Sequence, residues 1–229
     1  MNLSLEYIKM LLPSLAKGTL ETLTVFALTL VLALPIGLPI ALGSMSRFLP
    51  LRWLCRGYTW VFRGTPLMLQ LFFFYYGLGY IGNNYGVGFL VLDRFPAVII
   101  TFVLNYAAYF AEIYRGGIES IDYGQYEAAK TLGFTRWQTM RMIIFPQTIK
   151  RILPPVSNEA ITLIKDTALT MVISLPELMK AARDAANRDV DTTAYLLAAV
   201  VYLTLTLILT LVSNKLEKRF SRFEAKGEA

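Results

Sequence analysis

Long apolar segments constrain this chain more than any other feature of its sequence. A helix that crosses the hydrocarbon core of a bilayer needs roughly 20 predominantly apolar residues. Stretches that meet this requirement occur five times, at residues 19–42, 53–78, 95–114, 153–175 and 193–212. Charged residues account for 17% of the chain, against about 25% in a typical soluble domain. The sequence therefore predicts an all-α integral membrane protein, with five transmembrane helices in a single transmembrane domain over residues 1–229.

The second apolar segment is too long to cross a bilayer as one straight helix. Residues 53–78 would extend about 39 Å as a helix, whereas the hydrocarbon core is about 30 Å thick. The segment also contains "RGTP", in which Arg63 and Gly64 precede Pro66. We therefore expect the helix to break near Gly64 and Pro66, with Arg63 close to the cytoplasmic interface as an anchor or gate residue.

Prolines predict irregular backbone in two other places. Pro35 and Pro39 predict a kink in the second half of the first segment. Pro146 is expected to interrupt the helix before the fourth segment, and Pro154 and Pro155 are expected to open that segment.

Lysines and arginines are distributed unevenly over the connections between these segments. They concentrate in the first connection, in the third connection and in the tail, where they include Arg222 and Lys226. Cytoplasmic loops carry an excess of Lys and Arg, so we expect the N-terminus outside and the C-terminus in the cytoplasm. The loop before the fifth segment is a weak counter-signal, because its acidic residues balance its basic ones. The net charge of +6 is interpreted as a topology signal and not as a nucleic-acid surface.

The third connection contains a charged stretch, "GQYEAAKTLGFTRWQTMRMIIFPQ", at residues 124–147. Glu127 is expected to begin a short helix, and Gly133 suits the left-handed residue that ends one. Thr135 can cap a second helix. The apolar residues of that second helix are expected to form one stripe, at Trp137, Met140, Ile144 and Phe145. Residues 119–146 are thus predicted to form a compact helix–turn–helix knob on the cytoplasmic face.

The composition argues against chemistry within this chain. Histidine is absent, and Cys55 is the one cysteine, so the commonest general base and any cysteine-based metal site are excluded. We expect no catalytic residue and no metal site. The pattern G-x-x-x-x-G-K-[ST] is also absent from the sequence, which predicts that any ATP is bound by another polypeptide.

Polar residues share one face in each of two apolar segments, where ionisable side chains are costly and so are candidates for function. In the third segment the face carries Thr101, Asn105, Ala108 and Glu112, with Tyr109 beside it. In the fourth segment it carries Glu159, Thr162, Asp166 and Thr170, and Gln70 follows the expected break in the second. These faces predict a polar cavity. The alternative is that an acid pairs with Lys165, or that these residues only hold the helices together.

The knob has a recognisable spacing. Glu127-Ala128-Ala129, three residues, Gly133, nine residues, Ile143, one residue and Phe145-Pro146 resemble the EAA loop of bacterial ABC-importer permeases, with Phe145 where leucine is usual. Three other segments resemble the polar amino acid permeases that serve histidine, arginine, glutamine or cystine. They are "FRGTPLMLQLFFFYYGL" (62–78), "NYAAYFAEIYRGGIESIDYGQYEAA" (105–129) and "LPPVSNEAITLIKDTAL" (153–169). The resemblance covers roughly residues 19–220.

This resemblance implies a type I ABC-importer permease in the bacterial inner membrane, surrounded by membrane lipid. It implies an ATP-binding cassette ATPase that holds ATP and magnesium, an extracytoplasmic amino acid binding protein, and a second permease chain, identical or related. The ATPase would contact the EAA loop at Glu127, Ala128, Ala129, Gly133 and Arg136. In the cavity, an amino acid would meet acceptors for its cationic part at Glu112, Glu159 and Asp166, beside Thr162. Donors for its carboxylate would come from Gln70, Asn105 and Tyr109, or from backbone amides near Pro66.

The residues alone are also compatible with two other classes of protein. A self-contained secondary transporter or channel would use the buried acids as ion sites, but it leaves the knob unexplained. A scaffold that anchors a membrane enzyme complex would explain the knob but not the aligned acids. A requirement for ATP separates these alternatives from an importer.

Overall fold

The computed structural model describes residues 4–221, and every regular element in that range is a helix. The main helices are α1 (Leu5–Ser44), α2 (Leu49–Gly64), α3 (Leu67–Phe72), α4 (Leu78–Tyr85), α5 (Arg94–Glu119), α6 (Tyr123–Thr131), α7 (Arg136–Thr139), α8 (Phe145–Asp166), α9 (Leu178–Asp189) and α10 (Thr193–Ser221). Short π turns, η1 (Phe73–Gly77) and η3 (Met140–Ile144), and 3-10 turns, η2 (Gly88–Leu90) and η4 (Thr167–Ile173), join some of them. Arg222 and Lys226, which contribute to the predicted orientation, lie outside the described residues.

Three of the described helices are long and apolar enough to cross a membrane: Leu5–Ser44, Arg94–Glu119 and Thr193–Phe220. They contain the first, third and fifth predicted segments. The other two predicted segments are interrupted, the second between α2 and α3 and the fourth where α8 passes into η4.

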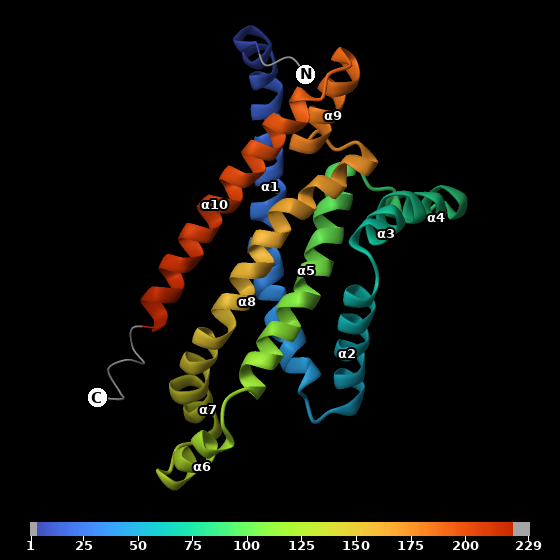
Figure 1. The fold of residues 1–229 in the computed structure, drawn as a ribbon. Helices are drawn as coiled ribbons and strands as arrows, with labels where there is room; N and C mark the ends of the chain where they lie inside the picture. The colour runs from blue at the N-terminus through green and yellow to red at the C-terminus, as the bar shows by residue number, and fades with distance from the viewer. Residues whose placement is uncertain (1–3, 222–229) are drawn as a thin grey trace.

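The long helices α1, α5, α8 and α10 run side by side, with α2 next to α5 (Figure 1). Small residues let α1 and α5 approach closely, since a Cβ atom added at Gly37 would lie 3.0 Å from Cβ of Phe110 and 3.2 Å from the carbonyl oxygen of Ala107. The core between them is built on buried residues such as Phe102 and Phe110. α1 remains one helix through Pro35 and Pro39.

The predicted break in the second segment is confirmed. α2 ends at Gly64, Thr65 is extended, and Pro66 caps the start of α3. Beyond the break, α3 and α4 turn away from the direction of α2 and project to one side (Figure 1). A residue before proline is pushed toward extended backbone, which is the conformation of Thr65 here.

The predictions for the prolines of the fourth segment were wrong. Pro146 does not interrupt the chain but stands in the first turn of α8, where the preceding backbone is a π turn with i→i+5 hydrogen bonds and not a regular α-helix. The π turn η3 leads directly into that turn. Pro154 and Pro155 do not open the helix either: they lie inside α8. Their rings hold backbone φ values that a helix accepts, although two helical hydrogen bonds are lost.

The helix–turn–helix knob of residues 119–146 forms at one end of the molecule, together with the α1–α2 connection (Figure 1). Gly133 is left-handed, with φ of 79°, as predicted. Thr135 caps α7 in a capping box with Gln138, which confirms its role. Helix α6 starts earlier than expected, at Tyr123, because Asp122 accepts a hydrogen bond from the backbone N–H of Gly124.

The predicted apolar stripe of the knob is only partly correct. Ile144 is fully buried and packs with Ile118 and Ile121, with Met140 against this cluster. Trp137, in contrast, is 70% exposed, because the four-residue helix α7 presents it away from the cluster.

At the opposite end, where α1, α9 and α10 come together (Figure 1), the buried carboxylate of Glu177 joins these three helices. Glu177 caps α9 by accepting hydrogen bonds from the backbone N–H groups of Met179 and Lys180, at 2.8 and 2.6 Å. It also accepts from the Tyr202 hydroxyl of α10 at 3.0 Å and from the Thr22 hydroxyl of α1 at 3.5 Å. These donors allow a carboxylate to be fully buried.

Candidate functional site

A cavity of about 530 Å³ opens where the α2–α3 break faces α5 and the end of α8. It is lined by Arg63, Gly64, Thr65, Pro66, Leu67, Asn105, Tyr106, Tyr109, Glu159, Thr162, Asp166 and Leu169. The volume falls in the range of small-molecule sites. The helical break therefore forms one wall of a hollow large enough for a small polar solute.

Two buried amide side chains stabilise the break. Gln70 donates to the carbonyl oxygens of Phe62 and Thr65, at 2.8 and 3.1 Å, and to the Thr65 hydroxyl at 2.8 Å. Asn105 donates to the same Phe62 carbonyl at 3.1 Å and to Oε1 of Gln70 at 3.0 Å. A helix that ends inside a membrane protein leaves carbonyls that need such donors. Both N–H groups of Asn105 are thus committed, so Asn105 offers the cavity its carbonyl oxygen.

The acidic wall of the cavity comes from α8. Glu159 and Asp166 both line the hollow, and the Tyr106 hydroxyl of α5 donates to Oδ2 of Asp166 at 2.8 Å. Arg63, from the end of α2, contributes the one positive charge among the lining residues. The lining therefore carries two carboxylates against one guanidinium, which favours a solute with net positive or balanced charge.

Arg63 separates this hollow from a second one on the side of the knob. The second cavity, of about 590 Å³, is lined by Arg56, Thr59, Trp60, Arg63, Gly64, Glu112 and Arg115. Arg63 and Gly64 are common to both linings. The Arg63 guanidinium lies 3.6 Å from Oε2 of Glu112 and 5.3 Å from the centre of the Tyr109 ring.

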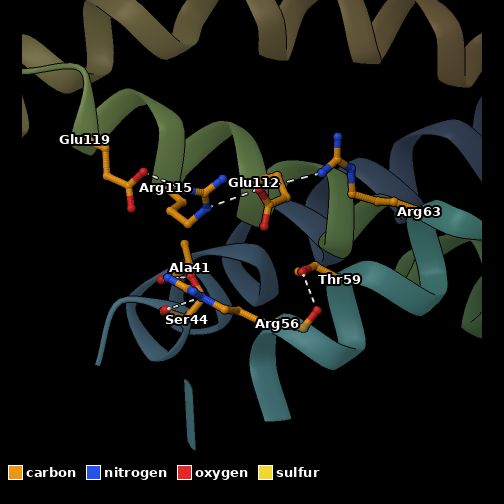
Figure 2. Close-up of polar contacts among 8 residues, drawn as sticks. All are labelled: Ala41, Ser44, Arg56, Thr59, Arg63, Glu112, Arg115 and Glu119. Carbon is orange, nitrogen blue, oxygen red and sulfur yellow. Dashed lines mark hydrogen bonds and ion pairs between the residues drawn. The ribbon is translucent and has the colours of Figure 1, made fainter. Parts of the chain in front are cut away.

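Glu112 is the centre of a chain of ionic contacts in the second cavity (Figure 2). It accepts two hydrogen bonds from Arg115, at 2.7 and 3.1 Å, and Arg115 also pairs with Glu119. Arg56 lies nearby and donates to the backbone carbonyl of Ser44 at 3.2 Å. The bidentate contact from Arg115 is much tighter than the contact from Arg63, so Arg63 is the partner that separates most readily.

The structure brings most of the predicted cavity residues together. Asn105, Tyr109, Glu159, Thr162 and Asp166 line the first cavity. Gln70 does not line this cavity but holds the broken helix beside it, through its bond to the Phe62 carbonyl. Glu112 lines the second cavity.

Two lining residues were missed as candidate ligands. Arg63 was assigned to the interface, and Tyr106 had no assignment although it follows Asn105 directly. The spacing between Tyr106 and Tyr109 could have indicated Tyr106, because residues three apart share a helix face.

In the knob, Glu127, Ala128, Gly133 and Arg136 are exposed. Ala129 is 1% exposed and packs inside the protein. The knob also exposes large apolar side chains, of which Trp137 alone was named from the sequence: Tyr123, Leu132, Trp137 and Met142. They belong to α6, to the residue that follows it, to α7 and to η3, the segments that also carry the EAA residues.

Over the described range, no group of three or more His, Cys, Asp or Glu side chains is arranged to hold a metal ion. The geometry supplies charged and hydrogen-bonding groups for binding a solute.

Comparisons with known proteins agree on one family. Residues 33–222 match the family described as "Binding-protein-dependent transport system inner membrane component". Among curated relatives, the "Probable amino-acid ABC transporter permease protein YckA" of Bacillus subtilis (strain 168) is 39% identical, over 92% of this chain and 91% of the relative. The "L-cystine transport system permease protein TcyB" of the same organism is 37% identical, over 93% and 89%. The "Arginine transport system permease protein ArtQ", also of that organism, is 37% identical, over 91% and 93%.

Solved structures show the same fold. A chain from "Crystal structure of an amino acid ABC transporter with histidines" superposes with a TM-score of 0.87 and 33% identity, covering 96% of this chain and all of that chain. A chain of the MetNI methionine ABC transporter in an inward facing conformation has a TM-score of 0.71 at 15% identity, covering 95% and 99%, and supports the fold alone.

Proposed function

Because this chain belongs to the family of binding-protein-dependent transport system inner membrane components, we propose that it forms the translocation pathway of an ATP-driven importer for a polar amino acid. ATP is hydrolysed by a separate ATPase subunit, and the substrate is delivered by an extracytoplasmic binding protein. A second permease chain completes the pathway. The complex is located in the bacterial inner membrane.

In this proposal the chain crosses the membrane five times. α1, α5 and α10 span it as long apolar helices. The broken unit of α2 and α3, and α8 with η4, make the other two crossings, since irregular backbone at membrane depth is tolerated where it lines a cavity. The N-terminal end of α1 and α9 lie outside, and the knob faces the cytoplasm, as the distribution of lysine and arginine favours.

The first cavity is the proposed substrate site. Glu159 and Asp166 accept from the ammonium group or from a cationic side chain, and the Asn105 carbonyl oxygen adds a third acceptor. Arg63 and Tyr109 hold the carboxylate. The observation that carries this assignment is a hollow of about 530 Å³ whose lining holds two carboxylates and one guanidinium. The names of relatives include cystine, arginine, glutamate/aspartate and glutamine, so a polar amino acid fits the family as well.

Arg63 also forms the inner boundary of that site. In the structure it contacts Glu112 and Tyr109 and belongs to both cavities. A substrate carboxylate competes with Glu112 for the guanidinium, because both are anions that an arginine can bind. Separation of the 3.6 Å ion pair would then open the way from the substrate site to the second cavity and the cytoplasm.

The ATPase docks on the knob. Glu127, Ala128, Gly133 and Arg136 are exposed there, beside the exposed apolar side chains of Tyr123, Leu132, Trp137 and Met142. Aromatic and methionine side chains with an arginine are typical of the core of a protein interface. Ala129 supports this surface from inside by allowing α6 to pack closely.

The test is uptake of labelled amino acids into proteoliposomes that contain this chain, its ATPase and its binding protein. Uptake should require ATP, and Asp166→Asn should raise the KM for a cationic or dipolar amino acid about tenfold or more. Glu6→Gln, which removes an exposed carboxylate far from the cavity, should leave uptake unchanged. If this chain alone moves substrate along a proton or sodium gradient, the secondary-transporter alternative is correct.

A further inference from the structure

A third hollow lies between α8 and α10, apart from the proposed substrate pathway. Its volume is about 370 Å³. It is lined by Lys150, Arg151, Leu153, Pro154, Asn214, Glu217, Lys218 and Phe220. These residues come from two helices that neighbour each other along their length, and the proposed function leaves the pocket without a role.

The pocket lies at the boundary of the membrane. Lys150 and Arg151 lie three and two residues before the fourth predicted segment, which begins at residue 153, and Asn214 and Lys218 lie two and six residues after the fifth, which ends at residue 212. Both edges of the pocket therefore reach the same boundary, at the depth where phospholipid headgroups lie. With the knob in the cytoplasm, that boundary belongs to the inner leaflet.

The charge of the lining suits an anion. Lys150, Arg151 and Lys218 supply three positive charges against the single carboxylate of Glu217. The Asn214 amide can donate as well. Arg151 also donates to the backbone carbonyl of Ser120, but a guanidinium has five N–H donors and so retains others.

The remaining lining is apolar and continues into the lipid-facing surface. Leu153, Pro154 and Phe220 offer contact for the glycerol backbone and the first methylenes of an acyl chain. Along α10, Leu203, Leu207 and Leu211 are largely exposed, at 69%, 58% and 59%. A ligand with an anionic head and an apolar tail can thus place its head in the pocket and its tail along α10.

We infer that this pocket binds the headgroup of an anionic phospholipid, with the phosphate held by Lys150, Arg151 and Lys218. Basic pockets between transmembrane helices on the cytoplasmic side are a recurrent form of such sites. The inference depends on membrane insertion and not on the importer mechanism, so either can fail without the other.

The site is linked to the knob through Arg151. Its bond to Ser120 joins α8 to the end of α5, two residues before the cap of α6 at Asp122. A bound phosphate would use other N–H donors of the same guanidinium, so that Arg151 would join the lipid headgroup to the Ser120 carbonyl. Lipid occupancy should therefore influence how firmly the knob is held.

The experiment is native mass spectrometry of the full chain in complex with its ATPase, titrated with dioleoyl phosphatidylglycerol, dioleoyl phosphatidylcholine or inorganic phosphate. One variant combines Lys150→Gln and Lys218→Gln. A matched control combines Arg47→Gln and Lys215→Gln, which removes two exposed basic residues outside the pocket. Each basic residue near an anionic headgroup is worth about 1 kcal/mol, so the pocket variant should bind phosphatidylglycerol roughly 30-fold more weakly.

The control variant should bind phosphatidylglycerol within about twofold of the unmodified protein, and phosphatidylcholine should bind weakly to all three. Equal losses in both variants would mean that general surface charge attracts the lipid, which overturns the inference. Displacement of phosphatidylglycerol by inorganic phosphate would show a phosphate-ion site and would overturn it too.

A second measurement needs no variant. A photoactivatable diazirine analogue of phosphatidylglycerol, incorporated with the unmodified complex into nanodiscs, should label peptides that contain residues 150–154 and 214–220. Labelling elsewhere but not in these peptides, including the case in which a second permease chain covers the pocket, would refute the assignment.

Discussion

Replacement of Gln70 by leucine should destabilise the break between α2 and α3. Leucine has a similar size but lacks the amide, whose two N–H groups are shared among the carbonyls of Phe62 and Thr65 and the Thr65 hydroxyl, and whose oxygen accepts from Asn105. The Phe62 carbonyl keeps its donor from Asn105. The Thr65 carbonyl and one N–H of Asn105 lose the partner that Gln70 provides.

Two independent estimates give a similar magnitude. Hydrogen bonds between helices in a bilayer average about 0.6 kcal/mol, so the loss of three, two donated and one accepted, amounts to roughly 1.8 kcal/mol. A buried polar group left unsatisfied costs about 1–3 kcal/mol, so two such groups cost roughly 2–6 kcal/mol. The free energy of unfolding should therefore fall by at least about 2 kcal/mol.

The assay is unfolding in mixed micelles with increasing denaturing detergent, followed by tryptophan fluorescence. Gln147→Leu is the matched control: it removes an amide that donates at 3.2 Å to Gln125 and at 3.0 Å to the Ile143 carbonyl, in a more exposed position. That variant should lose less than about 1 kcal/mol. If Gln70→Leu unfolds at the same detergent fraction as the unmodified protein, the amide network does not stabilise the break.

Three further predictions follow from other contacts. Gly18→Ala should lower the free energy of unfolding by about 1–3 kcal/mol, because the added Cβ would lie 2.9 Å from backbone atoms of residues 177 and 178. Gly57→Ala is the control: open space surrounds Gly57, so alanine there should raise the free energy of unfolding slightly. Equal shifts of the two unfolding curves would contradict this reasoning. Tyr106→Phe keeps a buried ring but removes the 2.8 Å bond to the cavity acid, so the KM for uptake should change several-fold with little change in unfolding; a large loss of stability would show a structural role instead. The bond from Arg188 lowers the pKa of Asp189 below its usual 3.8, and the hydroxyl of Tyr7 also donates to this carboxylate. A lowered pKa stabilises the fold above the usual value, and that effect is lost as the pH falls through the folded value. The protection factors of the α9 amides, which are exchange rates corrected for the intrinsic rate at each pH, should therefore stay constant from pH 7 to 5 and fall only below about 3.8; a fall already at pH 5 would refute this.

Local signals predicted the parts of the fold that depend on few neighbouring residues. The break at Gly64–Pro66 followed from segment length and from "RGTP". The left-handed Gly133 and the Thr135 cap followed from turn and capping preferences. The shared faces on α5 and α8 followed from helical spacing, and five of the seven predicted cavity residues line one hollow.

The features that the sequence did not predict depend on contacts between residues that are far apart in the chain. Gln70 does not line the cavity but stabilises the break behind its wall, because it donates a hydrogen bond to a carbonyl at the end of α2. Ala129 is buried and Trp137 exposed because the packing of the knob against Ile118 and Ile121 decides which side faces inward. The helix α9 was not predicted: its cap by Glu177 is local, but its buried side chains, such as Leu178 and Ala182, find their partners on α1 and α10.

The two prolines inside α8 divide that helix into unequal arms. The arm on the knob side continues through η3 into α7, which carries part of the surface proposed for the ATPase, and the far arm carries Glu159 and Asp166. Because Pro154 and Pro155 remove two backbone hydrogen bonds, the helix is weakest at this point and bends there first. The far arm extends about 17 Å from Pro155 to Asp166, so a bend of about 10° moves Asp166 by roughly 3 Å. That displacement is as large as the 2.8 Å hydrogen bond from Tyr106 to Asp166. A small bend at Pro154 and Pro155 is therefore enough to convert motion of the knob into a change of shape at the cavity.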